Sequence, residues 1–453
     1  MNKLEPFSKS SLPEISWPPL ASRPAAAMIS LLAYLEQSQW WPAEKLVAHQ
    51  LKQARIVLEH ACRTSHYYRE KLSNFDVSSD LTMERWRELP LLSRSDIQGA
   101  GEALFSSQVP PAHGKSFKRQ STGSTGQPVA TRGTALTQFF WSALTIRELL
   151  WHKRSLNGTL AIIRLIDRLD SLGNKRPDWG APFNLLYQTG PSALLNIMVD
   201  IREQAQWLRE LNPHYLLTYP SNLAGLLELF ERTGERLPRL LQVRTISETL
   251  TPELREMCKR VWGVPIVDLY SSSEAGNIAF QCPDGDCYHF QSESLLAEIL
   301  DDSGKPCGPG QVGQVILTSL HNFASPLIRY AIGDYAEVAE PCKCGRGLPA
   351  FKKVLGRRRN LITLPTGERF WPKFGFQEFS DIAPIRQYQV IQRAVNLLDI
   401  RLVTERQLND FQEIQLKNVI TKTLGYPFEI SFSYHDVIRS VAGKHEEFIS
   451  EVC

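Results

Sequence analysis

The 453-residue sequence lacks the features that would place the chain in a membrane, in a secreted disulfide scaffold or on nucleic acid. Every stretch of membrane-spanning length carries charges, and residues 1–20 contain no apolar core of signal-peptide length. The net charge of +3 is too small to favour nucleic acid or an anionic membrane surface. Eight cysteines in so long a chain do not indicate a disulfide framework. We therefore expect a cytoplasmic protein with no nucleic-acid partner and no membrane partner.

The composition is that of an ordinary globular chain, 43% hydrophobic and 22% charged, and the length calls for two or more domains. Residues 1–25 are rich in proline and serine and are expected to form a loose arm. From residue 158 onward strands alternate with helices, which is typical of an α/β fold around a mainly parallel sheet. The predicted helices span 135–152, 203–211, 222–233 and 252–261, and the predicted strands span 159–165, 215–218, 241–246 and 265–270.

The pattern changes twice more along the chain. From residue 296 it becomes β-rich, and after Gly356 a separate pattern of strands and one helix begins. We predict a large, multi-sheet α/β N-terminal domain over residues 1–356. A small, mobile α+β C-terminal domain is predicted over residues 357–453.

A run of hydroxyl residues and glycines offers many donors to phosphate oxygens; its sequence is Ser121-Thr122-Gly123-Ser124-Thr125-Gly126. The run lacks the Gly-Lys-Ser/Thr ending of a P-loop, so a nucleotide triphosphate would be held by a different design. The alternative is a flexible surface loop.

Three further segments carry residues suited to the same chemistry. Glu274 follows the predicted strand that ends at Tyr270, where a carboxylate can hold Mg²⁺ and the hydroxyl of Ser273 can bind a phosphate oxygen. Asp334 follows a glycine at a strand end and can accept both hydroxyls of a ribose. Lys444 can neutralise a carboxylate and an α-phosphate together. Taken singly, these residues are equally explained as a turn glutamate, an Asx turn and a solvated lysine.

In this order, the segments resemble the motifs of adenylate-forming enzymes, which include the acyl-CoA synthetases. The hydroxyl run resembles their phosphate loop, residues 270–274 their Tyr-Gly-x-Thr-Glu motif, and residues 329–334 their Tyr-Arg-Thr-Gly-Asp motif. The closer resemblance is to the phenylacetate–CoA ligase-like branch, including relatives encoded with capsular polysaccharide genes. It extends from about residue 45 to the end, and is carried by residues 61–68, 89–96, 219–223, 250–255 and 443–445.

The resemblance implies a reaction and a role for each motif residue. A carboxylic acid, aryl or acyl, would react with ATP and Mg²⁺ to give an acyl-adenylate, which then passes to a thiol such as CoA. Lys444 and Glu274 would be catalytic, with Glu274 also holding Mg²⁺, and Arg359 would lie at the hinge of the small domain. The implied nucleotide-binding residues are Ser121, Thr122, Gly123, Ser124, Thr125, Gly126, Glu248, Tyr270, Ser273, Asp334 and Arg357.

The sequence departs from the family pattern in ways that leave the second half-reaction open. Acidic residues follow Lys444, at Glu446 and Glu447, and would repel the phosphates of CoA. An adenylyltransferase that passes the acyl group to an amine, a sugar or a carrier protein is the alternative enzyme. A non-catalytic nucleotide-binding relative is the alternative from another class. A homodimer is compatible with the sequence, which does not select an oligomeric state.

The acid itself is not identified by the sequence. The segment between residues 165 and 215 has little of the glycine-rich substrate stretch of phenylacetate ligases. Residues 188–191 are interpreted as a plain loop, and Phe139, Phe140 and Trp141 as core residues of the helix over 135–152.

Two short cysteine-containing segments suggest a structural zinc site, because thiolates and an imidazole at tetrahedral reach suit Zn²⁺. Five residues compete for four ligand positions. The pattern in relatives implies Cys282, His289, Cys342 and Cys344, with Cys287 as the alternate. Unpaired cytosolic thiols are the competing explanation.

Overall fold

The computed structural model describes residues 10–12, 14–15, 17–77, 79–120, 129–166, 173–357, 360–372, 379, 382–438 and 447–452. The hydroxyl run, Arg359 and Lys444 lie outside these residues. The chain divides into two compact units. The first contains most of the chain up to Lys353, and the second contains the segment from Val354 onward together with Gly333–Tyr335.

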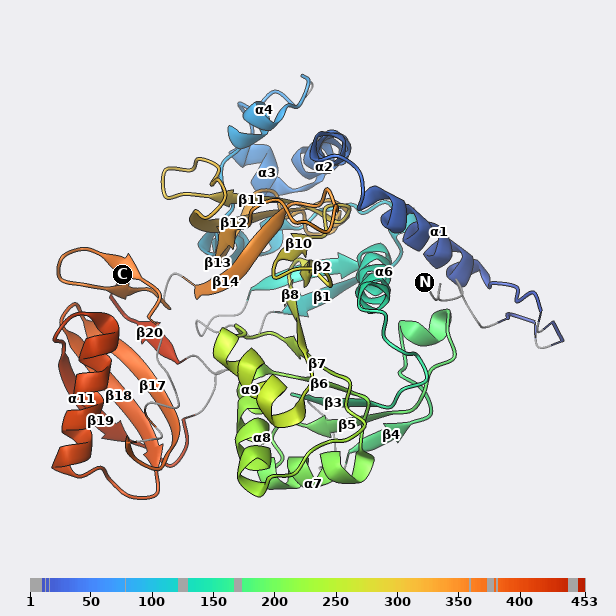
Figure 1. Ribbon diagram of the computed structural model, residues 1–453. Helices are drawn as coiled ribbons and strands as arrows, with labels where there is room; N and C mark the ends of the chain where they lie inside the picture. Colours follow the sequence, from blue (N-terminus) through green and yellow to red (C-terminus); the bar gives the residue numbers. More distant parts are fainter. Residues whose placement is uncertain are drawn as a thin grey trace. The chain divides into compact units, whose positions relative to one another are not determined.

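Among the described residues, twelve strands form one sheet in the order β11-β12-β13-β14-β10-β9-β8-β7-β6-β3-β5-β4. Five neighbouring strands pair in parallel: β5 (Ser192–Asn196), β3 (Leu160–Arg164), β6 (Tyr215–Thr218), β7 (Gln242–Ile246) and β8 (Ile266–Ser272). Helices α7 (Ile201–Leu211), α8 (Pro220–Thr233) and α9 (Pro252–Trp262) lie beside these strands (Figure 1).

A shared apolar core holds these helices against the parallel strands. Leu216, Val243 and Ile266 from the sheet pack with Leu226 and Phe230 of α8, all of them buried. The alternation of apolar strands with helices is the pattern that predicts βαβ units, and the predicted α/β class is confirmed.

Beyond β8 the sheet continues with β9 (Gly276–Gln281), β10 (Tyr288–Phe290), β11 (Leu295–Leu300), β12 (Val312–Ser319), β13 (Tyr330–Val338) and β14 (Ala350–Arg357). Here the pairs β8–β9, β9–β10, β10–β14 and β11–β12 are antiparallel. The short edge strand β4 (Asn174–Arg176) pairs antiparallel with β5 at the other end. The turn between β8 and β9 is therefore the point where the parallel part of the sheet gives way to the antiparallel part.

The N-terminal part of the first unit is helical. It contains α1 (Arg23–Ser38), α2 (Ala43–Thr64), α3 (His66–Lys71), α4 (Met83–Arg87), α5 (Arg94–Ala100) and the 3-10 turns η1 (Gly101–Leu104) and η2 (Pro111–His113). The hairpin of β1 (Ser116–Gln120) and β2 (Ala130–Thr134) leads into α6 (Ala135–Trp151), and η3 (Phe183–Leu185) follows later. Met28 and Leu35 of α1 are buried with Leu144 and Ile146 of α6, so these two helices share one core cluster.

The second unit carries its own core. A short hairpin, β15 (Ile362–Thr363) with β16 (Arg369–Phe370), precedes a sheet in the order β19-β18-β17-β20. These strands are β17 (Ile385–Ala394), β18 (Leu397–Thr404), β19 (Glu429–Tyr434) and β20 (Phe448–Ser450), and α11 (Asp410–Leu424) lies between β18 and β19 in the chain. Apolar residues of β18 and α11 are fully buried together. Within the described ranges of both units, no helix is long and apolar enough to cross a membrane.

Candidate active site and metal centre

Glu274 lies in the turn between β8 and β9, at the carboxyl end of the last parallel strand. Its side chain is only 7% exposed, and its Oε1 lies 3.9 Å from an η-nitrogen of Arg94. The backbone N–H of Ala275 donates to Oγ of Ser272 at 2.9 Å, which tightens the turn. Gly276 has φ +80°, and a Cβ there would lie 3.4 Å from the ring of Trp141. The turn thus places a buried carboxylate where open α/β sheets bind their ligands.

Sequence analysis did not single out Arg94, although the segment that carries it, residues 89–96, was used as a family marker. A capping box between Ser93 and Asp96 starts helix α5 at this arginine. Leu92 pairs with Tyr330 as a parallel bridge, which fixes the segment against β13. The available signal was a cation within a capping box, at the first position of the helix, and its partner lies 180 residues away in sequence.

Arg329 is a buried clamp at the start of β13. It has φ +47°, a conformation that is uncommon for a residue with a side chain. Its guanidinium donates to both carboxylate oxygens of Glu298 and to the backbone carbonyls of Arg87 and Leu89. The arginine of the third motif therefore fastens the segment before Arg94 to the strand that leads to Asp334.

A buried acid supports the strand that carries Tyr270 and Glu274. Asp268 accepts hydrogen bonds from Oγ1 of Thr245 at 2.6 Å and from the hydroxyl of Tyr288 at 2.9 Å. Burial raises the pKa of Asp268, while these two hydrogen bonds oppose the rise. Its contacts tie together β7, β8 and β10, so this acid braces the sheet beneath the site.

Other predicted nucleotide-binding residues of the first unit line the same edge of the sheet. Tyr270 is half-buried and packs edge-on against Phe351, with 5.9 Å between ring centroids. Ser273 is exposed beside Glu274. Glu248 accepts from the backbone N–H of Ser221 at 2.8 Å and from its hydroxyl at 3.0 Å, at the N-terminus of α8, where the helix dipole favours a carboxylate.

Asp334 and Arg357 are brought together within the second unit. Nε of Arg357 lies 3.4 Å from Oδ1 of Asp334, and the carboxylate is 16% exposed. The backbone N–H of Arg357 donates to Oδ1 of Asn360 at 2.9 Å. The aspartate predicted to accept the ribose hydroxyls is thus paired with another of the predicted nucleotide-binding residues.

Four potential metal ligands meet beside the β9–β10 hairpin. Sγ of Cys282, Nε2 or Nδ1 of His289, and Sγ of Cys342 and Cys344 all lie within 4.8 Å of one another. Sγ of Cys282 and Cys342 are 3.7 Å apart, and Sγ of Cys344 is 3.4 Å from Nε2 of His289. Tetrahedral zinc with Zn–S bonds of about 2.3 Å places its sulfur ligands about 3.8 Å apart, so the ligand spacing fits zinc.

The orientation of His289 also fits a metal ligand. The ring is fully buried, and its Nδ1 lies 3.1 Å from the carbonyl oxygen of Leu348. With a proton on Nδ1, Nε2 presents its lone pair to the thiols, which is the usual outer-shell arrangement of a metal-binding histidine. Cys287 lies outside the set of four, although its Sγ is 3.8 Å from Nε2 of the same ring. The four residues favoured by the family pattern are those that the fold assembles.

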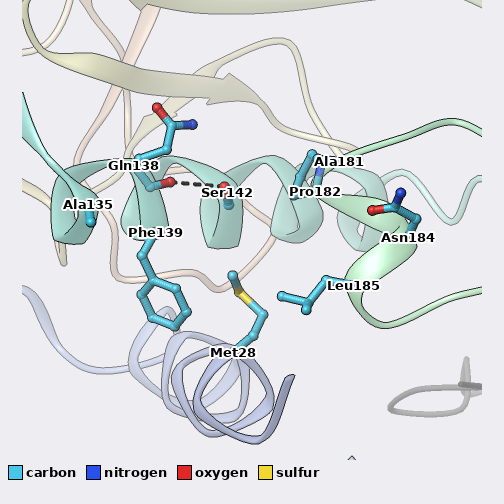
Figure 2. Close-up of a pocket in the computed structure, with 9 residues that line it drawn as sticks. All are labelled: Met28, Ala135, Gln138, Phe139, Ser142, Ala181, Pro182, Asn184 and Leu185. Carbon is cyan, nitrogen blue, oxygen red and sulfur yellow. Dashed lines mark hydrogen bonds between the residues drawn. The ribbon is translucent and has the colours of Figure 1, made fainter. Parts of the chain in front are cut away.

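A cavity of about 500 Å³ lies between α1, α6 and η3. Figure 2 shows Met28 of α1 between Phe139 of α6 and Leu185 of η3. Phe139 is half-buried at this cavity, whereas Phe140 stacks on His321 at 3.8 Å and Trp141 faces Gly276. The lining contains no charged side chain among the described residues; its members are Met28, Ala135, Gln138, Phe139, Ser142, Ala181, Pro182, Asn184 and Leu185.

No protein-family model matches the chain, but curated proteins do. It is 26% identical over 206 residues to the phenylacetate–coenzyme A ligase of Thermus thermophilus, covering 43% of this chain and 46% of the relative. It is 23% identical over 344 residues to the phenylacetate–coenzyme A ligase of Pseudomonas putida, covering 73% and 75%. The chain is a distant relative of acid–CoA ligases.

The fold agrees with this relationship. A crystal structure of 2-hydroxyisobutyryl-CoA ligase in the postadenylation state, in complex with an acyl-AMP, superposes with a TM-score of 0.69. The sequences are 17% identical, and the match covers 92% of each chain. The chain therefore has the fold of adenylate-forming CoA ligases.

Proposed function

We propose that this distant relative of acid–CoA ligases is an ATP-dependent, AMP-forming ligase that activates a carboxylic acid and transfers it to a thiol. The observation that supports this most is Glu274, a buried carboxylate at the carboxyl end of the last parallel strand of this fold. Its turn joins Tyr270 and Ser273 to the edge of the sheet where ligands bind.

The residues at this edge suit Mg²⁺ and ATP. Carboxylate oxygen is a preferred ligand of Mg²⁺, so Glu274 would hold the ion, and Ser273 would donate to a phosphate. In the first unit, Tyr270 would pack against adenine. In the second unit, Asp334 would accept from the ribose hydroxyls while Arg357 orients it. Bound Mg²⁺ would reduce the electrostatic repulsion between the substrate carboxylate and the α-phosphate.

Lys444 would stabilise the negative charge of the transition state. A carboxylate that attacks a phosphate is one anion approaching another, and an ammonium group beside both offsets their repulsion. The small domain over residues 357–453 would carry this lysine in during adenylation. Rotation about Arg359 would then bring in the acceptor and exclude water from the labile adenylate.

CoA is the acceptor favoured by the names of the relatives, which are coenzyme A ligases. Two acidic residues, Glu446 and Glu447, follow Lys444, and of these the structure describes Glu447. Their negative charge would repel the phosphates of CoA, so an amine, a sugar and a carrier-protein thiol should be tested alongside CoA.

An ATP–pyrophosphate exchange screen across aryl, acyl and amino acids tests the proposal, followed by acceptor trials with the acid that exchanges. Exchange with at least one acid is expected, as is its loss in Lys444→Ala with ATP binding retained. Full adenylation by that variant would overturn the role of the lysine. ATP binding without exchange for any acid would favour the non-catalytic nucleotide-binding relative.

We also propose that Cys282, His289, Cys342 and Cys344 hold one structural zinc ion. Four protein ligands leave no open position, so the ion would join the β9–β10 hairpin to the loop that follows β13 and take no part in the chemistry. Elemental analysis of the purified protein should find one zinc per chain, and a protein without zinc would refute the assignment.

A further inference from the structure

The junction between α1 and α2 is held by the loop that carries two of the cysteines. We call residues 39–41 the elbow and residues 342–348 the knuckle. Gln39 is 1% exposed although its side chain is polar. Its backbone carbonyl accepts from the N–H of Gly347 at 2.9 Å, and its Oε1 accepts from Nε of Arg346 at 2.9 Å. The elbow is therefore fastened through both its backbone and a side chain.

The backbones of elbow and knuckle are in direct contact at Gly347. A Cβ on this residue would lie 1.7 Å from the carbonyl oxygen of Trp41, far inside van der Waals contact. Any side chain at this position would force the two segments apart, because the opposing atom belongs to the backbone and cannot rotate away. Glycine at 347 is what lets the knuckle dock.

Arg346 links the metal ligands to the elbow. Its guanidinium lies over the rings of Trp40 and Trp151, at 4.8 and 4.5 Å from their centroids, while its backbone N–H points at Sγ of Cys344 at 3.4 Å. Its η-nitrogen also contacts Asp284 at 3.2 Å. Three thiolates around Zn²⁺ carry a net negative charge, which a buried guanidinium beside them complements.

The knuckle has little regular structure to hold its own shape. It connects β13 to β14, and one weak turn, from the N–H of Gly345 to the carbonyl of Cys342 at 3.4 Å, is its internal backbone hydrogen bond among the described residues. Cys342 and Cys344 are both knuckle residues, so ligation would fix the loop that the elbow packs on.

We infer that the metal ion proposed for the Cys/His cluster fastens the α1–α2 elbow to the sheet, with Arg346 as the positioning residue. The inference rests on the zinc assignment and is independent of the proposed ligase activity. Because α1 also carries Met28, the same ion supports one wall of the cavity between α1, α6 and η3. The cluster is thus an anchor for the N-terminal helices.

Hydrogen–deuterium exchange on the full chain tests this directly. Removing zinc with a chelator should speed exchange at least about tenfold in α1 and the elbow, because their anchoring contacts are lost. Exchange in α11 of the second unit should stay unchanged, which distinguishes local release from global unfolding. Cys307→Ser, a cysteine outside the cluster, should keep both zinc and protection.

Two variants break the link without removing a ligand. Gly347→Ala should retain one zinc per chain, and yet its elbow should exchange hydrogen for deuterium as fast as the elbow of the chelated protein. Arg346→Ala should do so in part, with Arg346→Lys intermediate because lysine keeps the charge but not the planar stacking. An elbow that stays protected in zinc-free protein, or in Gly347→Ala, would overturn the inference. Protein purified without zinc would overturn both this inference and the zinc assignment. The proposed ligase activity would be unaffected by that result, because ATP–pyrophosphate exchange tests it separately.

Discussion

Two sites of opposite character lie close together in sequence: Cys282 follows Glu274 by eight positions. The Cys/His cluster is closed: its four donor atoms lie within 4.8 Å of one another, and its outer contacts, such as Nδ1 of His289 with Leu348, lie inside the protein. Glu274 is buried but faces Arg94 at 3.9 Å, beyond hydrogen-bond distance. A closed set of ligands suits a structural ion, whereas a carboxylate held beside a cation has capacity left for a ligand.

The largest expected effect comes from opening the closed site. Cys342→Ser should lose its zinc and lower Tm by about 10 °C, because structural zinc contributes about 10 kcal/mol in small domains and part of this is lost here. Calorimetry with metal analysis measures both. Cys307→Ser is the matched control and should keep its zinc. A stable Cys342→Ser protein with full zinc would contradict the ligand set.

The second effect separates chemistry from stability at the open site. Glu274→Gln keeps the size of the side chain but removes its charge, and should slow ATP–pyrophosphate exchange about 10²- to 10³-fold. Its Tm should change little, since the partner Arg94 is itself partly exposed, at 20%. Glu253→Gln, an exposed glutamate on α9, is the control. Equal activity of the two variants would remove Glu274 from the site.

A smaller effect sharpens the role of Arg94. The guanidinium competes with a divalent cation for Glu274, so Arg94→Ala should lower the Mg²⁺ concentration needed for half-maximal exchange while reducing the maximal rate about tenfold. Arg55→Ala, a surface arginine paired with Glu59, should leave both values unchanged. A rate loss with an unchanged Mg²⁺ dependence would make Arg94 a merely structural residue.

The parallel part of the fold could be predicted from local pattern. The strand predicted over 241–246 is β7, Gln242–Ile246, because apolar runs between helical segments mark buried strands. β5, Ser192–Asn196, was not predicted, because the preceding segment gave no helical pattern that would frame it. Tertiary pairing with β3 creates this strand.

The two sites also differ in how far they could be predicted from the sequence. The spacing of the cysteines indicated a metal site with five candidate ligands, and the resemblance to relatives reduced these to four with one alternate. The pairing of Arg94 with Glu274 depends on a bridge between Leu92 and Tyr330, a contact across more than 200 residues that no local pattern encodes. Long-range contacts of this kind are where sequence reasoning stops.

The smallest expected effect is on folding stability in acid, and it involves a histidine outside both sites. His321 stacks on Phe140, and its Nε2 lies 2.8 Å from the carbonyl of Glu293. Burial lowers the pKa of His321 from 6.5 to about 4, with His113 adding repulsion. The folded state therefore favours the neutral ring, so its stability is complete above pH 6.5 and declines as the pH falls toward 4. The loss is at most about 1.4 kcal/mol per pH unit for one histidine.

His321→Asn should remove this part of the acid slope, since asparagine does not titrate. Urea unfolding of both proteins at pH 7 and pH 5 gives the comparison, and the difference between them isolates the histidine from any acid release of zinc, which affects both alike. The variant should lose less stability than the parent on acidification. An identical loss in both would mean that acid destabilises this fold through other groups, such as the Cys/His cluster or His152, whose pKa burial also lowers to about 4.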